Sequence, residues 1–170
     1  REFATLHLGT AQGRGETTIG DDCLFMAGSH VAHDCVVGNH VMLANGSAFA
    51  GHCTVEDHVI CGGLSGVHQF SRLGRFAFIS GGAMVTMDIP PYCTAQGDRA
   101  ALAGLNTVGL TRAGFTSEQV SRIKGAYKVV FRSGLGLREA LAHVAAEFGG
   151  HPEIDHFVRF IEGSERGIAR

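Results

Sequence analysis

The stretch GSHVAHDCVVGN, from Gly28 to Asn39, contains residues that can do chemistry. His30 and His33 are three residues apart, and Asp34 follows the second histidine directly. An imidazole beside a carboxylate can act as a general base, because its pKa is near neutral and the carboxylate can orient the ring. The same residue types can also ligate a metal or form a polar surface. The spacing of the surrounding chain favours one of these interpretations.

Apolar residues recur every six positions through the first half of the chain. From residue 19 to residue 85, all twelve positions at this interval are apolar: Ile19, Phe25, Val31, Val37, Leu43, Phe49, Val55, Cys61, Val67, Leu73, Ile79 and Val85. Neither a helix nor a simple alternating strand has this period, but a parallel β-helix of hexapeptide repeats does. Each hexad is then a short strand and a turn, with one apolar residue pointing inward.

Three hexads close one coil, so a residue lies directly beside its counterpart eighteen positions on. This register stacks Asp34 with His52, and it places His33 in one column with Gly51 and Gln69. His68 is one position away on the third of these coils. Imidazoles beside a carboxylate on rigid coils suit a general base with fixed partners. Five other histidines are interpreted as solvated or hydrogen-bonded spectators: His40, His58, His143, His151 and His156.

A metal site is the competing interpretation of this column. Histidine ligands of zinc-binding β-helix trimers are separated by four residues, and no histidine pair of the repeat region has that spacing. Cys35 and Cys53 stack one coil apart but occupy a position that holds small residues throughout the repeat, which indicates packed thiols. No Walker or dinucleotide motif is present. We therefore expect no metal and no cofactor.

Composition limits the remaining classes. The chain has 170 residues, 45% hydrophobic, with a formal net charge of −2. These values predict a globular protein that binds no nucleic acid, and no apolar run is long enough to insert into a membrane. The five cysteines form no CxxC pair, so free thiols and a cytoplasmic location are expected. Because the chain begins with Arg1, an N-terminal truncation is also expected.

The repeat ends at Pro90 and Pro91, and a helical pattern begins later. Thr116 and Gln119 form a capping-box signature before an apolar stripe that ends near Gly134. A second helix is predicted up to Gly149, and Pro152 opens a third. The predicted organisation is a β-helix over 1–92, a connector over 93–115 and a C-terminal helical domain over 116–170, so the fold class is mainly β with an α-helical tail.

Several motifs in this order resemble one family. SHVAHDCVVGNHVMLANGSAFAGH, GGLSGVHQF, IPPYCTAQG and the ending RGIAR are similar to the UDP-N-acetylglucosamine O-acyltransferases, the first enzymes of lipid A biosynthesis. The resemblance covers nearly the whole chain, but the family has several more coils at its N-terminus. It implies a left-handed β-helix and a homotrimer with active sites between subunits. It also implies transfer of a (3R)-3-hydroxyacyl chain from acyl carrier protein to the sugar 3-hydroxyl.

The resemblance also implies roles for individual residues. His33 is the general base, Asp34 orients it, and the backbone N–H of Gly51 stabilises the oxyanion. The implied substrate contacts are His30, His52 and Gln69 for the sugar or acyl group, His68, Asn106 and Arg112 for the nucleotide diphosphate, and His7 for the sugar. The resemblance implies that Gly81 helps to set the length of the acyl chain. Phe78, half a hexad earlier, could block the same groove, and a preference for about 12 to 14 carbons is expected.

Two departures from the family pattern concern the acceptor. HLGT stands where HRGT is common, and Val108 and Ala113 replace an acidic and a basic residue near the nucleotide. A sugar with an amine in place of the 3-hydroxyl is therefore an alternative acceptor.

The donor and the class of protein also have alternatives. Lys124, Lys128 and Arg132 form a stripe at i, i+4 and i+8 of the first tail helix, with Arg122 nearby, and this stripe would suit an acidic carrier protein. A solvated helix face is the alternative. The rival functions are a hexapeptide acyltransferase that uses acetyl-CoA and a non-catalytic β-helix scaffold.

Overall fold

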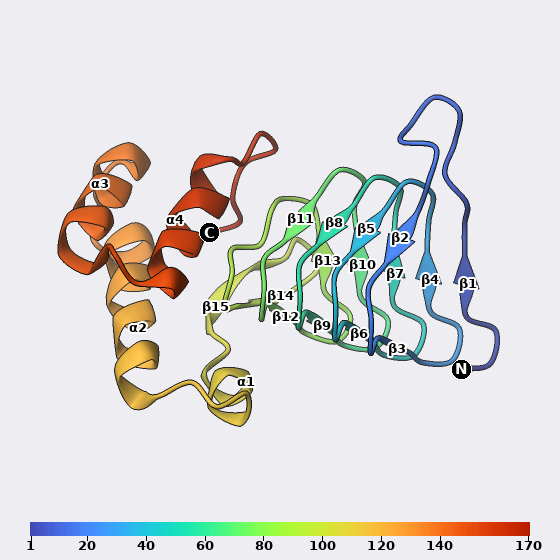
Figure 1. Cartoon of the computed structure of the whole chain (residues 1–170), viewed down its shortest axis with the longest axis horizontal. Coiled ribbons are helices and arrows are strands. Elements are labelled where there is room, and N and C mark those ends of the chain that lie inside the picture. Colours follow the sequence, from blue (N-terminus) through green and yellow to red (C-terminus); the bar gives the residue numbers. More distant parts are fainter.

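The structure of the protein is a computed structural model that describes all residues from 1 to 170. Its first half is a parallel β-helix whose short strands form three sheets (Figure 1). Four helices follow at the C-terminal end, and none of them is long and apolar enough to cross a membrane. The predicted fold class, a β-helix with an α-helical tail, is confirmed.

The three sheets are named A, B and C. Sheet A contains β1 (Thr5–Leu6), β4 (His30–Val31), β7 (Ala48–Phe49), β10 (Gly66–Val67) and β13 (Met84–Val85). Sheet B contains β2 (Thr18–Ile19), β5 (Val36–Val37), β8 (Thr54–Val55) and β11 (Arg72–Leu73). Sheet C contains β3 (Leu24–Phe25), β6 (Met42–Leu43), β9 (Ile60–Cys61), β12 (Phe78–Ile79), β14 (Cys93–Gln96) and β15 (Ala101–Leu105).

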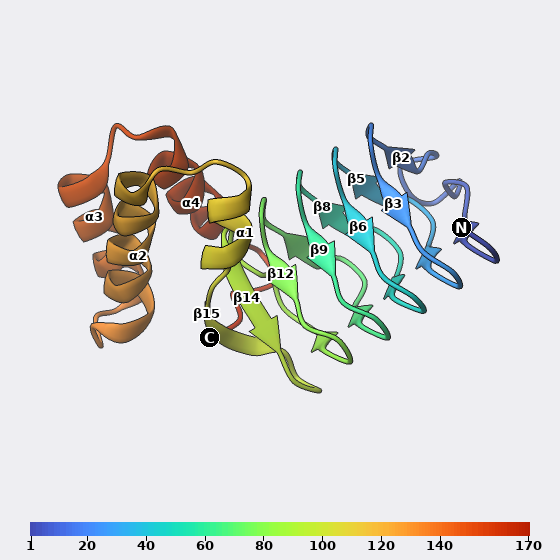
Figure 2. The same cartoon turned by 90° about the horizontal axis from the view of Figure 1, so that it is seen from below.

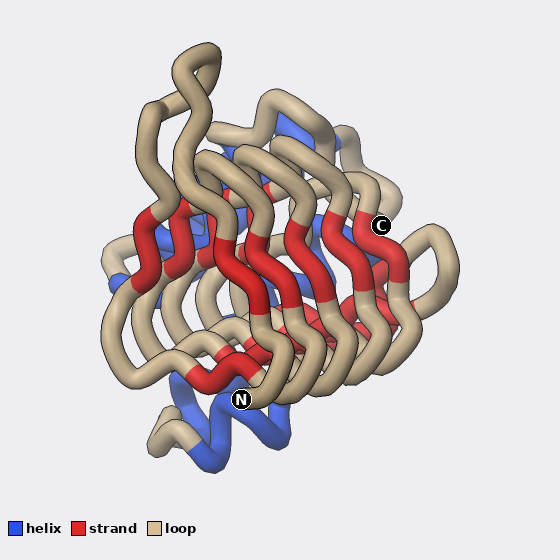
Figure 3. Tube along the Cα trace, turned by 90° about the vertical axis from the view of Figure 1, so that its right-hand side faces the viewer, coloured by secondary structure: helices blue, strands red, loops and turns tan.

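Most neighbouring strands pair in parallel with a shift of eighteen residues, as Met42 does with Ile60. The second residue of each strand points into the coil, and Val31, Leu43 and Phe49 are almost fully buried there. Figure 3 shows the coils stacked behind one another. The stacking produces three corners, each a column of turn residues along the β-helix.

Two coils depart from this register. Thr5 pairs with His30, 25 residues away, so the first coil has seven extra residues. They form the loop that projects from the β-helix between β1 and β2 (Figure 1). At the other end, Phe78 pairs with Thr94, only 16 residues away, after Pro90 and Pro91. The sequence period gave no indication of the projecting loop.

Residues 93–115, predicted as a connector, contain ordered elements. β14 continues sheet C, and β15 returns beside it in an antiparallel hairpin with an irregular register near Thr94. The short helix α1 (Thr107–Arg112) then lies beside the end of sheet C (Figure 2).

The tail has three longer helices, α2 (Ser117–Arg132), α3 (Leu137–Phe148) and α4 (Pro152–Glu162). The capping box of Thr116 and Gln119 is present at the start of α2, and Pro152 occupies the first turn of α4. Each helix buries one apolar stripe, in which Ile123, Val144 and Phe157 are at most 1% exposed. These apolar stripes pack against one another, which removes them from water, and the polar faces of the helices remain on the surface.

Candidate active site

The corner between sheets A and B carries the His33 column. Asp34, His52 and Phe70 occupy the same turn position on successive coils, each in the left-handed backbone region with φ near 60°. This conformation projects their side chains outward in the same direction. The rings of His52 and Phe70 stack 4.6 Å apart at 10°, which is close to the spacing of neighbouring strands. The β-helix therefore fixes both the separation and the orientation of these side chains.

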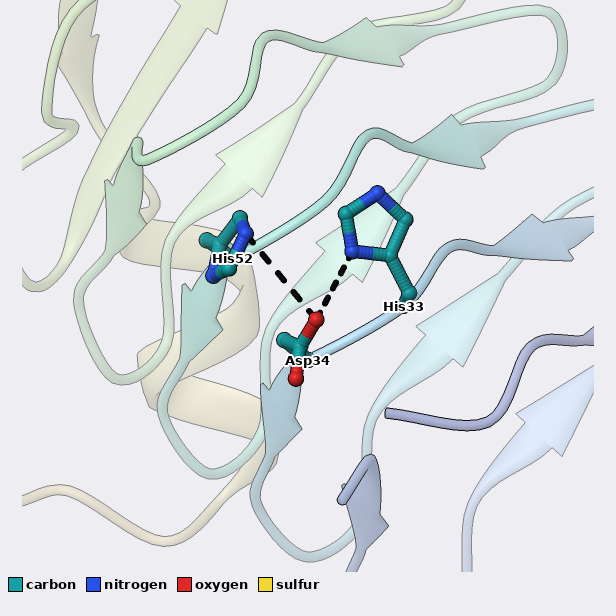
Figure 4. Close-up of side chains that lie close together, drawn as sticks. All are labelled: His33, Asp34 and His52. Atoms are coloured by element: carbon teal, nitrogen blue, oxygen red, sulfur yellow. Dashed lines mark hydrogen bonds and ion pairs between the residues drawn. The ribbon is translucent and has the colours of Figure 1, made fainter. Parts of the chain in front are cut away.

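His33 and Asp34 form the polar centre of this corner (Figure 4). Nδ1 of His33 lies 2.8 Å from Oδ2 of Asp34, and Nε2 of His52 lies 3.9 Å from the same oxygen. The Asp34 side chain is completely buried, whereas the His33 side chain is 40% exposed. An ionised carboxylate only accepts hydrogen bonds, so Nδ1 of His33 carries the proton and the neutral ring has its lone pair on Nε2.

The projecting loop keeps Asp34 ionised. The hydroxyl and the backbone N–H of Thr10, and the backbone N–H of Gly15, donate to its carboxylate at 2.7 to 3.2 Å. Burial alone would raise the pKa of Asp34, but the hydrogen bonds from Thr10, His33 and Gly15 outweigh it and hold the pKa well below its usual range. Asp34 is therefore a permanent acceptor for His33.

Sequence spacing underestimated how closely possible metal ligands approach at this corner. One ligand atom each of His33, Asp34 and His52 lies within 4.8 Å of the others. However, the two oxygens of Asp34 already accept hydrogen bonds from four donors: the N–H and hydroxyl of Thr10, the N–H of Gly15 and Nδ1 of His33. A metal would have to replace the proton on Nδ1. The arrangement fits an oriented base better than a metal ligand set.

Gly51 lies beneath the imidazole of His33, as the register predicted. A Cβ at this position would lie 2.7 Å from Cε1 and 2.8 Å from Nε2 of His33, so a side chain would displace the ring. The Gly51 N–H donates to no group of the chain, and the same is true of the N–H groups of His33 and Gln69 at equivalent turn positions. A free N–H beside Nε2 can bind an oxyanion.

Three further histidines lie on the same side of the β-helix, on sheet A. Nδ1 of His30 contacts the Thr5 hydroxyl at 2.8 Å, and its ring lies edge-on to His7 with centroids 4.6 Å apart. Burial and the neighbouring His7 lower the pKa of His30.

His68 and Gln69 are exposed on the third coil of this corner. Phe70, which the sequence analysis did not single out, covers the face of His52, and its position eighteen residues after His52 was the available signal.

Asn106 and Arg112 lie at a different corner, between sheets B and C. They line a cleft of about 580 Å³ whose other walls are His40, Met42, His58, Ile60, Phe76, Phe78, Thr94, Leu105, Thr107, Val108, Gly109 and Ala113. The Asn106 side chain caps α1, accepting from the Gly109 N–H and donating to the Phe76 carbonyl, both at 3.0 Å. Asn106 therefore orients α1, and exposed Arg112 at the end of α1 faces the cleft.

The histidines interpreted as spectators have varied environments. His40 and His58 line the cleft with their rings stacked 4.6 Å apart, and burial together with His40 lowers the pKa of His58. His156 of α4 contacts Glu56 at 2.8 Å, and His143 contacts Glu147 at 3.3 Å on an exposed helix face. The His156 contact ties the helical tail to the β-helix.

The two residues expected to set acyl length are separated. Phe78 lines the cleft, whereas Gly81 is exposed at the corner between sheets C and A and does not line it. A Cβ on Gly81 would meet only the Gly63 backbone, at 3.4 Å and beyond. A larger side chain at position 81 is therefore sterically acceptable.

The predicted basic patch on α2 is smaller than expected. Lys124, Lys128 and Arg132 are exposed on one stripe. Arg122 instead donates twice to the buried Glu153 of α4, at 2.8 and 3.0 Å. Burial of Glu153 requires a partner for its charge. Arg122 therefore holds α2 against α4 and is not free to bind a carrier protein.

Two family models match the chain. One describes bacterial transferase hexapeptides in six repeats and matches residues 16–51, and the other describes domain 2 of UDP-N-acetylglucosamine O-acyltransferase and matches residues 88–169. The stacked coils and the first of these matches define a hexapeptide-repeat β-helix, which over this segment is similar to bacterial transferases.

Individual relatives narrow this class. Acyl-(acyl-carrier-protein) UDP-N-acetylglucosamine O-acyltransferases of Myxococcus xanthus and Anaeromyxobacter dehalogenans are 63% and 60% identical, over 100% of this chain and 66% of each relative. The structure of UDP-N-acetylglucosamine acyltransferase from Campylobacter jejuni matches with a TM-score of 0.89 and 37% identity, over 99% of this chain and 68% of that one. The corresponding enzyme of Moraxella catarrhalis has a TM-score of 0.94 and 40% identity, with coverages of 98% and 65%.

The chain belongs to the UDP-N-acetylglucosamine O-acyltransferase family, and the resemblance seen in its motifs is confirmed. It spans about two thirds of the length of the relatives it matches.

Proposed function

We propose that the protein transfers a (3R)-3-hydroxyacyl chain from acyl carrier protein to the 3-hydroxyl of UDP-N-acetylglucosamine. The observation that carries this proposal is the His33–Asp34 pair, in which a buried, ionised carboxylate leaves Nε2 of an exposed imidazole free to accept a proton. Membership of the family supports the identity of donor and acceptor. A β-helix scaffold without activity would have no use for a carboxylate held by four donors beside an exposed imidazole.

The reaction assigns a step to each residue of this corner. Nε2 of His33 takes the proton of the sugar hydroxyl as its oxygen attacks the thioester carbonyl carbon. The carbonyl oxygen becomes an oxyanion, which the Gly51 N–H stabilises. When the intermediate collapses, the carbon–sulfur bond breaks and the leaving thiolate receives the proton from Nε2. Asp34 stays ionised throughout and stabilises the imidazolium.

The proposed reaction is tested by incubating the protein with UDP-N-acetylglucosamine and 3-hydroxyacyl carrier proteins of several chain lengths. Formation of the acylated nucleotide sugar and release of free carrier thiol are measured. Parallel reactions contain acetyl-CoA as donor or a 3-amino sugar nucleotide as acceptor. Transfer only from acetyl-CoA, or no transfer to any acceptor, would exclude the proposed reaction. All five cysteines are unpaired, as is usual in a reducing compartment, so we propose a cytoplasmic location for the reaction.

We further propose that the site is completed in a homotrimer. His33 lies at the corner between sheets A and B, whereas Arg112 lines a cleft at the corner between sheets B and C, so sheet B separates them within one chain. A second copy can place its Arg112 cleft against the first copy's His33 corner. Exposed apolar side chains, including Phe70 at 53% and Val108 at 61%, are then available to pack at the interface.

The trimer is expected to show complementation between two inactive variants. His33→Ala and Arg112→Ala are each prepared alone and co-expressed with distinct tags. In a mixed trimer, a wild-type His33 corner can meet a wild-type Arg112 cleft, so the mixture should regain a measurable part of the activity. Sedimentation equilibrium at micromolar concentration checks the mass. A monomer, or mixed trimers no more active than the separate variants, would contradict a shared site.

Acyl length gives a second expectation at the proposed site. Phe78→Ala should shift preference toward longer donors, because it opens the cleft by several methylenes, each worth about 0.8 kcal/mol when buried. Gly81→Met should shift preference toward shorter donors if Gly81 lines the groove of the assembled trimer. Rates of each variant with donors of about 10 to 18 carbons are compared with those of the wild type. Unchanged rate ratios in either variant would remove that residue from the acyl site.

A further inference from the structure

The C-terminal segment returns from α4 to the last coil of the β-helix, so the chain ends between the helices and the coils (Figure 1). Backbone bonds join Asp88 to Gly167 and Ala169 at 2.9 and 3.0 Å. The completely buried Asp88 carboxylate accepts from the Ser164 hydroxyl at 2.8 Å and from the Arg72 N–H at 2.8 Å. Residues 164–169 are therefore attached to the β-helix through their backbone and Ser164, independently of the side chain between them.

That side chain belongs to Arg166, and it reaches His68. Its Nε donates to the Thr86 carbonyl at 2.7 Å, and a terminal nitrogen lies 2.7 Å from Nδ1 of His68. Thr86 and His68 occupy the same position on neighbouring coils, because they are eighteen residues apart. The bond to Thr86 fixes the guanidinium plane, and the second nitrogen is then directed at the imidazole.

This contact determines the tautomer of His68. A guanidinium donates hydrogen bonds and cannot accept them, so Nδ1 must present its lone pair and the proton must lie on Nε2. Nδ1 also lies 3.2 Å from the Gln69 carbonyl, but a bond there requires the opposite tautomer. The contact with Arg166 is shorter and charge-assisted, so it prevails.

The tautomer matters because His68 is exposed at the corner that carries the proposed base. Gln69, its neighbour, lies two coils from His33 in the same column, and Phe70 covers His52. With Nδ1 engaged by Arg166, Nε2–H is the free group of the ring, and it can donate to an oxygen of a bound molecule. The opposite tautomer would present a lone pair, which repels such an oxygen.

We propose that Arg166 is a positioning residue that holds His68 as an Nε2–H donor toward an oxygen of the acceptor substrate. This inference rests on the proposed function for the identity of that substrate. The C-terminal segment would thereby contribute to the site of His33, which lies more than one hundred residues earlier in the sequence.

Nuclear magnetic resonance tests the tautomer without any activity measurement. Long-range proton–nitrogen spectra of the protein with 15N-labelled histidine distinguish the two tautomers, and His68→Gln identifies the His68 signals by their loss. The wild type should show the Nε2–H form. In Arg166→Met, which removes the donor but keeps the chain length, the Nδ1–H form that bonds Gln69 should appear. Arg159→Met is the matched control, because Arg159 is an exposed arginine of α4 whose side chain makes no hydrogen bond.

Kinetics then tests the consequence. Losing one oriented donor should raise KM for UDP-N-acetylglucosamine about threefold to tenfold in Arg166→Met, with kcat within about twofold, and Arg166→Lys should recover part of the loss. The double variant His68→Gln with Arg166→Met should be no worse than His68→Gln alone, since the arginine acts through the histidine.

Each outcome decides a separate point. An unchanged tautomer in Arg166→Met, or additive effects in the double variant, would overturn the role of Arg166. A changed tautomer in a protein that transfers no acyl chain would leave the Arg166–His68 contact established and overturn the proposed function. Thermal unfolding of each variant shows whether the backbone attachment at Asp88 persists.

Discussion

His33→Ala is expected to lower kcat/KM for acyl transfer by about 10² to 10⁴, the range that general-base catalysis supplies. Alanine removes Nε2, the free acceptor beside the Gly51 N–H, so the sugar hydroxyl loses its base. The His33 side chain is 40% exposed and takes no part in the apolar interior, so the fold should be unaffected. Steady-state rates with a 3-hydroxyacyl carrier protein measure the effect, and circular dichroism with thermal unfolding verifies the fold.

His143→Ala is the matched control for this variant. His143 also lies beside a carboxylate, Glu147, but on the exposed face of α3. Its removal should leave the rate unchanged. If His33→Ala retains activity within about tenfold of the wild type, His33 is not the base and another group must take the proton.

Asp34→Asn should produce the second large effect, a loss of about 10² or more in kcat with a smaller change in KM. The amide can present one oxygen, either to His33 or to the N–H groups of Thr10 and Gly15, and its NH2 group then opposes the donor on the other side. If the oxygen faces the loop, the NH2 group faces Nδ1 of His33 and favours the tautomer that cannot act as a base through Nε2. The same variant should also loosen the projecting loop.

The pH dependence of stability separates the structural effect of Asp34 from the catalytic one. Because the pKa of Asp34 is held below its usual range, the ionised carboxylate stabilises the fold above that range, and this contribution disappears as the pH falls through the folded-state pKa. The difference in unfolding free energy between wild type and Asp34→Asn should therefore be fully present at pH 7 and shrink below about pH 4. Asp155→Asn is the matched control for the kinetic measurement on Asp34→Asn. It alters a carboxylate at the start of α4, and kcat for acyl transfer should stay unchanged. If the difference in unfolding free energy stays constant down to about pH 2, Asp34 is not stabilised as an anion.

The sequence predicted those features that depend on local spacing. The interval of six residues placed Val31, Leu43 and Phe49 inside the coils, and the capping box of Thr116 and Gln119 marked the start of α2. The shift of eighteen residues was sufficient to bring Asp34 to His52 and Gly51 beneath His33. Each of these predictions uses only the geometry of one repeating unit.

Features that depend on contacts between distant segments were not predictable. The loop that binds Asp34 is an insertion that breaks the repeat, so nothing in the period indicates where Thr10 lies. Arg122 looked like part of a basic stripe, and only the packing of α2 on α4 pairs it with Glu153. Arg166 and His68 are 98 residues apart, and no local pattern relates them.

The column arrangement also restricts which insertions the protein can accept. Six extra residues between Asp34 and His52 would keep the inward apolar pattern but shift every later turn to the next corner, which would separate these two side chains. One or a few extra residues must leave the β-helix as an outward loop, as the seven residues between β1 and β2 do. Eighteen extra residues between Gly51 and Gln69 would preserve every face and move His68 away from His33 by one strand spacing, about 4.8 Å. The gap between base and substrate-binding residues can therefore change only in whole coils, which makes the duplication or deletion of a coil the natural unit for altering substrate size.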